Sequence, residues 1–331
     1  MAEPARRHAR VGPAAEEAVI EVLRSGRYIG GPVVDEAEAA LARRMGFRQG
    51  VGAASGTAAL VQALMALGVR GRVAVPALTF FATVEAVRQA GGEPVIVDVL
   101  PDRPQMDPSA IPTVDAVVPV HLFGARAPEV DHPLVIADAA QSVGWGWGPP
   151  QGRAAALSLY PTKTLGVAGD GGAVLTDDPE LAERIRGVGH HGMAARNLHT
   201  HLGMNSRLDA VQAAVMLAHL GDLDRRVQAR RRHADTYDLL GLGLPRDPRD
   251  GVHQYIVLHP ERDRLRQDLD AAGVDTALYY PRPVDAQPVM GGLSNCPNAQ
   301  RFCDTALAIP VHGELHPDEH ERVLTALRRW V

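Results

Sequence analysis

Between residues 50 and 189 the sequence alternates between short apolar runs and longer amphipathic stretches. The runs RVAVP (72–76), EPVIVDV (93–99) and PLVIADAAQS (133–142) have the length of strands. The stretch TFFATVEAVRQAGG (79–92) has the length and periodicity of a helix. Alternation of this kind places helices on both faces of a mostly parallel sheet. The sequence therefore predicts an α/β fold.

Other segments complete the predicted architecture. We expect helices at 13–25, where Pro13 starts the helix, at 33–46 with Gly46 as C-cap, and at 206–240 with a bend near Gly221, while 187–204 reads as a loop. A strand at 253–260 and helices at 262–273 and 316–331 indicate a smaller α+β unit. Residues 1–240 are thus the predicted large domain and 241–331 the small C-terminal domain. Residues 1–30 are candidates for packing with the small domain.

Charge and cysteine content exclude several classes of protein. The formal net charge is −5, and the densest basic run, 225–232, has helical spacing, so it indicates a solvated helix face rather than a nucleic-acid surface. Cys296 and Cys303 lack the spacing of a metal or redox pair, which favours a cytoplasmic protein with free thiols. No apolar run has membrane-spanning length, and we expect no signal peptide and no metal site.

Lys163 is unusual because it is the one lysine among 34 lysine and arginine residues. Arginine replaces lysine wherever a solvated positive charge is enough. It cannot replace a lysine that must lose its proton and attack a carbonyl group. Lys163 lies in a turn before a glycine-rich run, not on a charged helix face. We therefore interpret it as an amine nucleophile that forms a Schiff base.

Polar and aromatic residues follow several of the predicted strands, where open α/β sheets bind ligands. Ser55-Gly56-Thr57 opens a helix and has the form of a phosphate cradle, although an ordinary N-cap would look the same. Asp138 ends an apolar strand and could pair with a protonated ring nitrogen or cap the next turn. Phe80 could stack on a flat ring or pack in the core. Together these signals describe a flat, phosphorylated, protonated aldehyde, pyridoxal 5'-phosphate (PLP).

Motifs across nearly the whole chain resemble the DegT/DnrJ/EryC1/StrS family of PLP-dependent aminotransferases. The resemblance rests on RSGRYIGGPVV, SGTAAL, PALTFFATVEAV, VPVHLFG, ADAAQSVG, SLYPTKTLG, GDGGAVLTDD, GMNSRLDAVQAAV and HQYIVLHPERD, in this order. It implies the PLP-dependent transferase type I fold of aspartate aminotransferase. That fold has a mostly parallel central sheet of the seven-stranded type with helices on both faces, and a smaller C-terminal domain.

The resemblance also implies roles for single residues. It makes Lys163 the Schiff-base lysine and Asp138 the partner of the pyridine nitrogen, and these two are the expected catalytic residues. It assigns the remaining cofactor contacts to Gln141 near the ring hydroxyl, to Ser55, Gly56, Thr57 and Ser158 at the phosphate, to Phe80 on the ring, and to Asn205 reaching in from a neighbouring subunit. His191, Tyr28 and Asp285 are the expected substrate contacts.

The function that the resemblance implies is amino transfer. An amino group would move from Glu or Gln to a keto group of a nucleotide-linked sugar, through pyridoxamine 5'-phosphate, in secondary-metabolite or polysaccharide biosynthesis. A homodimer with shared active sites is implied as well. Alternatives are a cyclitol ketone as acceptor, a sugar dehydratase, against which Lys163 argues, and a non-catalytic PLP-binding regulator. The chain has Thr164 and Asp285 where the family commonly has Asn and His, so the acceptor is the least constrained part.

Overall fold

A computed structural model describes residues 3–145 and 148–331 of the chain. Its central sheet consists of strands β1 (Gln49–Ala53), β2 (Arg72–Pro76), β3 (Glu93–Val97), β4 (Ala116–Val117), β5 (Ile136–Asp138), β6 (Ala154–Ser158) and β7 (Gly172–Thr176). Two hydrogen-bonded groups, in the orders β1-β7-β6-β5 and β3-β2-β4, make up this sheet. Parallel bridges from Val117 to Val135 and from Val120 to Asp138 join them. The combined order is β1-β7-β6-β5-β4-β2-β3.

Strand direction in the sheet agrees with the prediction. β5 pairs with β6, and β2 pairs with β3 and β4, all in parallel. β7 runs antiparallel to both of its neighbours, β1 and β6, so β1 points the same way as the parallel strands. The carboxyl ends of β1, β2, β5 and β6 therefore lie at one edge of the sheet. The predicted mostly parallel α/β fold is confirmed.

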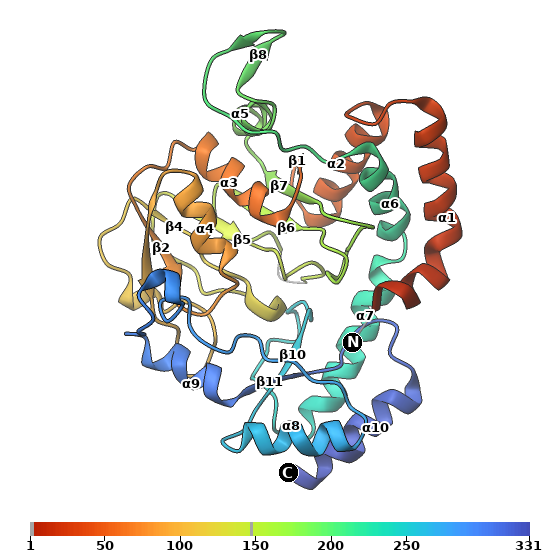
Figure 1. Cartoon of the computed structure of the whole chain (residues 1–331), viewed down its shortest axis with the longest axis vertical. Coiled ribbons are helices and arrows are strands. Elements are labelled where there is room, and N and C mark those ends of the chain that lie inside the picture. Colours follow the sequence, from red (N-terminus) through yellow and green to blue (C-terminus); the bar gives the residue numbers. More distant parts are fainter. Residues whose placement is uncertain (1–2, 146–147) are drawn as a thin grey trace.

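Helices cover both faces of the sheet (Figure 1). On one face, α2 (Pro32–Met45) and α6 (Ala210–Leu220) share a core with Ala155 and Leu157 of β6. On the other face, α3 (Gly56–Ala66), α4 (Ala82–Gln89) and α5 (Pro179–Gly189) share a core with Ala154 and Ala156. Because successive strand residues point to opposite faces, a strand buried on both sides is apolar at every position.

The first helix, α1 (Glu3–Ser25), corrects one prediction. We expected Pro13 to start a helix, but the helix starts ten residues earlier and Pro13 lies inside it. Proline fixes a helical φ and removes one intrahelical donor, which normally ends or kinks a helix. Here the residues before Pro13 make tertiary contacts, including Arg6 with Glu319 and the buried Arg7, and these contacts offset the loss.

Two other regions behave as the sequence predicts only in part. The bend near Gly221 is confirmed, since α6 ends at Leu220 and α7 spans Leu223–Asp238. The segment 187–204, expected to be a loop, contains a hairpin of β8 (Met193–Ala195) and β9 (Leu198–His199) that projects beyond α5 in Figure 1. Its strands are short and largely exposed, so the sequence has no alternating apolar pattern that would reveal them.

The C-terminal part contains the antiparallel pair of β10 (Tyr255–Leu258) and β11 (Ala306–Ile309), and the helices α8 (Arg262–Ala271), α9 (Pro297–Thr305) and α10 (Pro317–Leu327). The sequence prediction had missed α9 and β11. Short 3-10 helices lie at Pro108–Ala110, Leu122–Gly124, Pro288–Met290 and Arg328–Trp330. Tyr237 of α7 packs in the same core as Leu265 and Leu307. The division at residue 240 remains a prediction.

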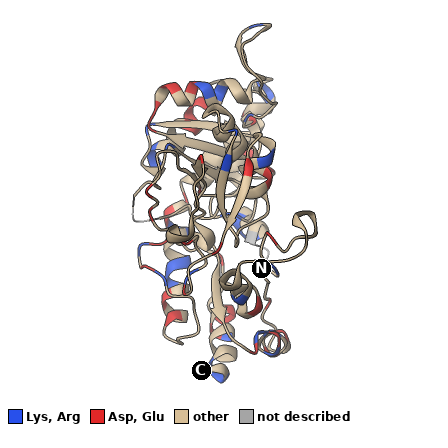
Figure 2. Ribbon diagram, turned by 90° about the vertical axis from the view of Figure 1, so that its left-hand side faces the viewer, with Lys and Arg blue, Asp and Glu red and all other residues tan. Residues whose placement is uncertain are grey.

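The surface mixes charges of both signs. Figure 2 shows acidic and basic segments interspersed along the ribbon. Within the described ranges no helix is long and apolar enough to cross a membrane. Cys296 and Cys303 are both free and buried.

Candidate active site

The predicted site residues gather at the edge of the sheet where the parallel strands end. Asp138 is the last residue of β5, and Ser158 is the last residue of β6. Lys163 lies in the turn that connects β6 to β7, and Ser55 caps α3 just after β1. Phe80 follows β2 at the start of α4. Because these four strands point the same way, their loops meet at one edge, as in ligand-binding α/β proteins generally.

Asp138 is a deep carboxylate with defined partners. Its Oδ2 accepts a hydrogen bond from the Thr83 hydroxyl at 2.9 Å, and its Oδ1 accepts one from the Ala140 amide at 3.1 Å. Burial raises the pKa of Asp138, while Ala140, Thr83 and the charge of Lys163 oppose this. The side chain remains partly accessible despite this desolvation. A cationic group placed beside this carboxylate would make its ionised form more favourable.

Lys163 is desolvated in the same region. Burial lowers the pKa of its amine from 10.5 to about 8, and the nearby Asp138 charge opposes the shift. The backbone around it forms a tight turn, in which Lys163 N donates to Tyr160 O at 2.8 Å and Gly166 N donates to Lys163 O at 2.9 Å. A substantial fraction of this amine is neutral at a slightly alkaline pH, which a nucleophile or general base requires.

The start of α3 packs closely against the end of β6. Ser55 is the N-cap of α3, and its Oγ accepts a hydrogen bond from Ala58 N at 3.1 Å. A Cβ at Gly56 would lie 2.6 Å from the Ser158 Cβ, so only glycine fits here. The N-terminus of α3, with the positive end of its dipole and Thr57 in its first turn, therefore lies beside Ser158 at the end of β6. This is the donor set of a phosphate site.

Gln141 and Phe80 lie near a residue that the sequence prediction had missed, Tyr280. Gln141 Oε1 accepts a hydrogen bond from Phe123 N at 2.8 Å, and its Nε2 donates to the Tyr280 hydroxyl at 3.0 Å. The rings of Phe80 and Tyr280 are 6.2 Å apart. Phe80 is 61% exposed, which is high for a phenylalanine and leaves its ring free to contact a ligand. Burial raises the pKa of Tyr280, so its hydroxyl stays protonated.

Sequence reasoning also missed His253, which lies near Lys163. It is buried just before β10, and its carbonyl accepts a hydrogen bond from Arg230 Nη1 at 2.9 Å. Burial, followed by the charges of Lys163 and Arg230, lowers its pKa well below 6.5. Its Nδ1 has no hydrogen-bond partner within the part of the chain that is described. His253 is therefore a neutral imidazole. Because it lies 90 residues beyond Lys163 in the sequence, no local pattern indicated that the two residues are close.

The remaining predicted contacts have other surroundings in the single chain. Asn205 Oδ1 accepts a hydrogen bond from Arg207 at 2.7 Å, and the His191 carbonyl accepts one from His199 at 2.9 Å. Tyr28 is exposed on the loop before α2. Asp285 accepts hydrogen bonds from Ser294 Oγ at 3.0 Å and from Asn295 N at 2.8 Å. Their roles toward cofactor and substrate remain predictions.

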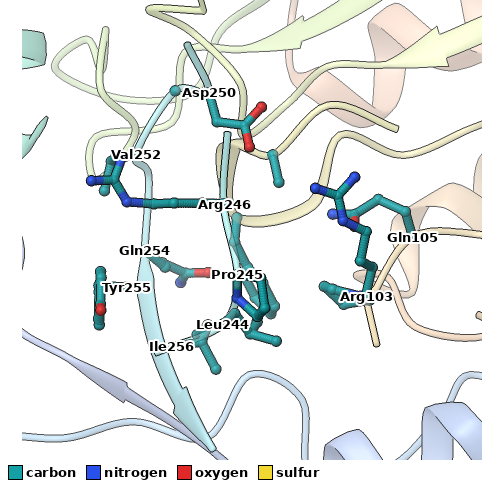
Figure 3. Close-up of a pocket in the computed structure, with 14 residues that line it drawn as sticks. Arg103, Gln105, Leu244, Pro245, Arg246, Asp250, Val252, Gln254, Tyr255 and Ile256 are labelled. Atoms are coloured by element: carbon teal, nitrogen blue, oxygen red, sulfur yellow. The ribbon is translucent and has the colours of Figure 1, made fainter. Parts of the chain in front are cut away.

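A small cavity lies between the loop at 103–105 and residues 244–256 (Figure 3). Its volume is about 40 Å³, and neither Lys163 nor Asp138 lines it. A space of this size holds a few water molecules but no cofactor. The Asp250 carboxylate beside it accepts hydrogen bonds from the Arg126 and Asp247 amides. We therefore assign the chemistry to the edge of the sheet. Among the described residues, no cluster of histidine, cysteine or carboxylate side chains could hold a metal ion.

A desolvated lysine near a desolvated aspartate, at the carboxyl edge of this sheet, is the arrangement expected of a PLP-dependent transferase of the type I fold. The family model described as the DegT/DnrJ/EryC1/StrS aminotransferase family matches residues 10–328. The chain belongs to that family, and the predicted family, enzyme class and cofactor are confirmed.

Known relatives match this chain over nearly their whole length, and a solved structure has the same fold. The "Pleiotropic regulatory protein" of Geobacillus stearothermophilus is 36% identical over 100% of this chain and 98% of its own length. The "dTDP-3-amino-3,4,6-trideoxy-alpha-D-glucose transaminase" of Streptomyces venezuelae is 37% identical over 95% and 91%. The "UDP-2-acetamido-2-deoxy-3-oxo-D-glucuronate aminotransferase" of Pseudomonas aeruginosa is 35% identical over 96% of both. The crystal structure of S. venezuelae DesV in complex with a ketimine intermediate has a TM-score of 0.92 at 35% identity, covering 99% of this chain and 96% of that chain.

The residues present fit PLP. The desolvated Asp138 carboxylate suits the protonated ring nitrogen, and the Lys163 amine suits the aldehyde. The glycine-lined start of α3 beside Ser158 suits the phosphate, because a side chain at Gly56 would close that approach. The exposed ring of Phe80 suits the flat face of the pyridine.

Proposed function

We propose that this aminotransferase transfers an amino group from glutamate or glutamine to the keto group of a nucleotide-linked sugar. The observation that carries the proposal is the Lys163 amine, desolvated and near the Asp138 carboxylate, in a chain of this family. The acceptor class is supported by the two related proteins from Streptomyces venezuelae and Pseudomonas aeruginosa, whose names specify dTDP- and UDP-linked sugars. A cytoplasmic setting and biosynthesis of a metabolite or polysaccharide are part of the same proposal.

Each site residue has a defined task in this proposal. When bound, PLP supplies an electron-poor ring that takes up the electrons of the substrate α-carbon and stores the amino group between the two half-reactions. Asp138 holds a proton on the ring nitrogen through its charge. Lys163 Nζ, as a neutral amine, would take the proton from the α-carbon of the donor and deliver it to the cofactor carbon that carried the aldehyde. Gly56, Thr57 and Ser158 hold the phosphate.

We further propose that two copies of the chain share their active sites. Asn205 lies on the segment after the β8–β9 hairpin, and its side chain is exposed in the single chain. His191 and Tyr28 are exposed as well. A neighbouring subunit that placed Asn205 near the Ser158 phosphate site would bury these groups. Sedimentation of the purified protein would test whether it is a dimer. Mixing Asn205→Ala chains with Lys163→Ala chains would test the sharing of sites, because a mixed dimer has one of its two sites intact and should regain activity.

Replacing Lys163 tests the proposal as a whole. The wild-type protein with PLP should be yellow, and glutamate should convert the bound cofactor to pyridoxamine phosphate. Lys163→Ala should lose covalent cofactor and reduce amino transfer by about 1000-fold or more. Lys163→Arg keeps the charge but not the nucleophile, so it should fail equally. A protein that binds no PLP under any condition would sink the proposal.

Two alternatives are distinguished by the substrate. Inosose-type ketones should be poor acceptors beside dTDP- and UDP-linked keto sugars, whereas the reverse order would favour the cyclitol alternative. A cofactor that binds but is never converted by any amino donor would favour a regulatory protein. That outcome matters here because one relative is named a regulatory protein.

A further inference from the structure

A buried arginine of the first helix holds the backbone of the lysine turn. Arg7 of α1 is 2% exposed. Its Nη1 donates hydrogen bonds to Pro161 O and to Gly166 O, each at 3.1 Å, and its Nη2 donates to Lys163 O, also at 3.1 Å. One guanidinium therefore joins three carbonyl groups within six residues, including that of Lys163 itself.

These hydrogen bonds add to those that the turn makes with other groups. Lys163 O accepts from Gly166 N at 2.9 Å as well as from Arg7. Gly166 O accepts a second hydrogen bond from His219 Nδ1 at 2.6 Å. Because a carbonyl only accepts, His219 carries its proton on Nδ1, and burial lowers its pKa to about 4, so the ring is neutral. Removing Arg7 would leave three carbonyls short of a donor, two of them with a single remaining bond.

The start of α1 is fixed from its other side by the C-terminal part of the chain. Arg6 donates to both carboxylate oxygens of Glu319 at 2.5 and 2.6 Å, and Arg10 lies 3.4 Å from Glu314. Both arginines are exposed, so each ion pair contributes little to stability by itself. They differ from Arg7 in burial and in partner, which makes Arg6 a suitable control for changes of charge in this helix.

We infer that Arg7 is a positioning residue for Lys163, acting through the carbonyl groups of the turn at 161–166; the inference rests on the proposed function. The Lys163 side chain is unbranched and flexible, so the position of Nζ depends on the backbone beneath it. A planar fork with several donors fixes several carbonyls at once, which an ammonium group cannot do in the same geometry. A displacement of about 1 Å at a reacting group costs about 100-fold in rate. Arg7 should therefore matter for lysine chemistry and not for holding the cofactor phosphate.

The test separates capture of the cofactor aldehyde from binding of the cofactor as such. When the neutral Lys163 amine adds to the PLP aldehyde carbon, a C=N bond forms and one water leaves. Borohydride then reduces that bond to a stable amine, which mass spectrometry counts. Pyridoxamine phosphate carries no aldehyde, so its affinity reports on the site without Lys163 chemistry. If the wild-type protein bound neither PLP nor pyridoxamine phosphate, the proposed function would have failed, whatever the role of Arg7.

Arg7→Ala and Arg7→Lys should slow capture of PLP by the apo-protein about tenfold or more. Both should bind pyridoxamine phosphate within about twofold of wild type, and Arg6→Ala should change neither quantity by more than that. Millimolar guanidinium should restore capture in Arg7→Ala but not in Arg7→Lys. A cavity of about 280 Å³, lined by Arg7, Pro161 and His219 among others, gives the ion access.

Three results would overturn the inference. The first is capture at the wild-type rate in both variants. The second is an equal loss of PLP capture and pyridoxamine phosphate binding, which would make Arg7 a general support of the site. The third is failure of both variants to fold, which would make it a stability residue. Thermal unfolding of each variant, measured alongside capture, identifies the third case.

Discussion

The Thr83 hydroxyl lies 2.9 Å from Oδ2 of Asp138, and it lies 2.8 Å from the hydroxyl of Thr79. A carboxylate accepts hydrogen bonds only, so Thr83 donates to Asp138 and Thr79 can donate to Thr83 in turn. Two threonines of the loop and helix after β2 thus form a relay of donors toward the last residue of β5. The relay favours the ionised form of a carboxylate that burial disfavours.

Thr83→Val should make the enzyme more sensitive to acid. Losing the donor raises the pKa of Asp138 further, so the protonated carboxyl persists to higher pH and the acidic limb of kcat/KM moves upward. At a pH on that limb, kcat/KM should fall about tenfold, the worth of a hydrogen bond to a charged group. Thr83→Ser keeps the hydroxyl and should keep the wild-type profile. Superimposable profiles for Val and Ser would contradict the relay.

The amine of Lys163 should react with amine reagents at unusually low pH. Because Lys163 is the one lysine of the sequence, peptide mapping separates its labelling from that of the N-terminus. Its pKa is lowered to about 8 by burial, so the rate of acylation in the apo-protein should reach half its plateau near that pH. The unfolded chain should show a midpoint near 10.5. A folded-state midpoint near 10.5 would show that the amine is solvated.

The sign of the associated pH effect on stability follows from the same shift. Between about 8 and 10.5 the unfolded chain holds a proton on Lys163 that the folded chain has released. The free energy of unfolding of the apo-protein should therefore rise with pH across this window. Lys163→Met should remove that rise, and denaturant titrations at pH 8 and pH 10 would measure it. An identical change with pH in Lys163→Met would assign the effect to other groups.

Phe80 and Phe81 should behave oppositely when truncated. Phe80 is 61% exposed, whereas Phe81 packs against the buried core beneath α3 and α4. Phe80→Ala should weaken PLP affinity about tenfold, the value of a ring stack, with little change in thermal stability. Phe81→Ala should lower stability by about 2 kcal/mol or more, because a cavity remains. Equal losses of PLP affinity in the two variants would argue against stacking by Phe80.

Gly56→Ala should weaken the phosphate site. Its new Cβ would lie 2.6 Å from Ser158 Cβ, so the start of α3 or the end of β6 must shift. We expect PLP affinity to fall about tenfold or more, since the amides and hydroxyls no longer converge. Gly221→Ala is the matched control, because its Cβ would meet only Ala218 O at 3.7 Å. If Gly56→Ala bound PLP as tightly as the wild type does, the start of α3 would not be the phosphate site.

Much of the fold could be predicted because its signals are local. Gly46 ends α2 in the left-handed conformation that a C-cap needs, and the apolar runs of β2 and β5 are those of strands buried on both faces. Residues at strand ends, such as Asp138, were also accessible to this reasoning, because parallel strands bring their ends together regardless of side-chain detail.

The rest of the site depends on contacts between distant segments. Tyr280 meets Gln141 139 residues away in sequence, and Arg7 meets Lys163 156 residues away. No local pattern encodes either pairing. Pro13 even suggested that the helix did not extend back to Arg7, because the rule for proline considers one hydrogen bond and not the tertiary contacts on the preceding turn.

The support of the lysine turn has a consequence for how the protein matures during synthesis. Arg7 emerges from the ribosome long before Lys163. Arg6 can pair with Glu319 only when synthesis is nearly complete, because Glu319 follows 313 residues later. Nascent chains can therefore form the sheet and expose the lysine before α1 has docked on both of its partners. Cofactor capture would then require Arg7 to dock on the turn at 161–166, whereas the later pairing of Arg6 with Glu319 would leave capture unchanged.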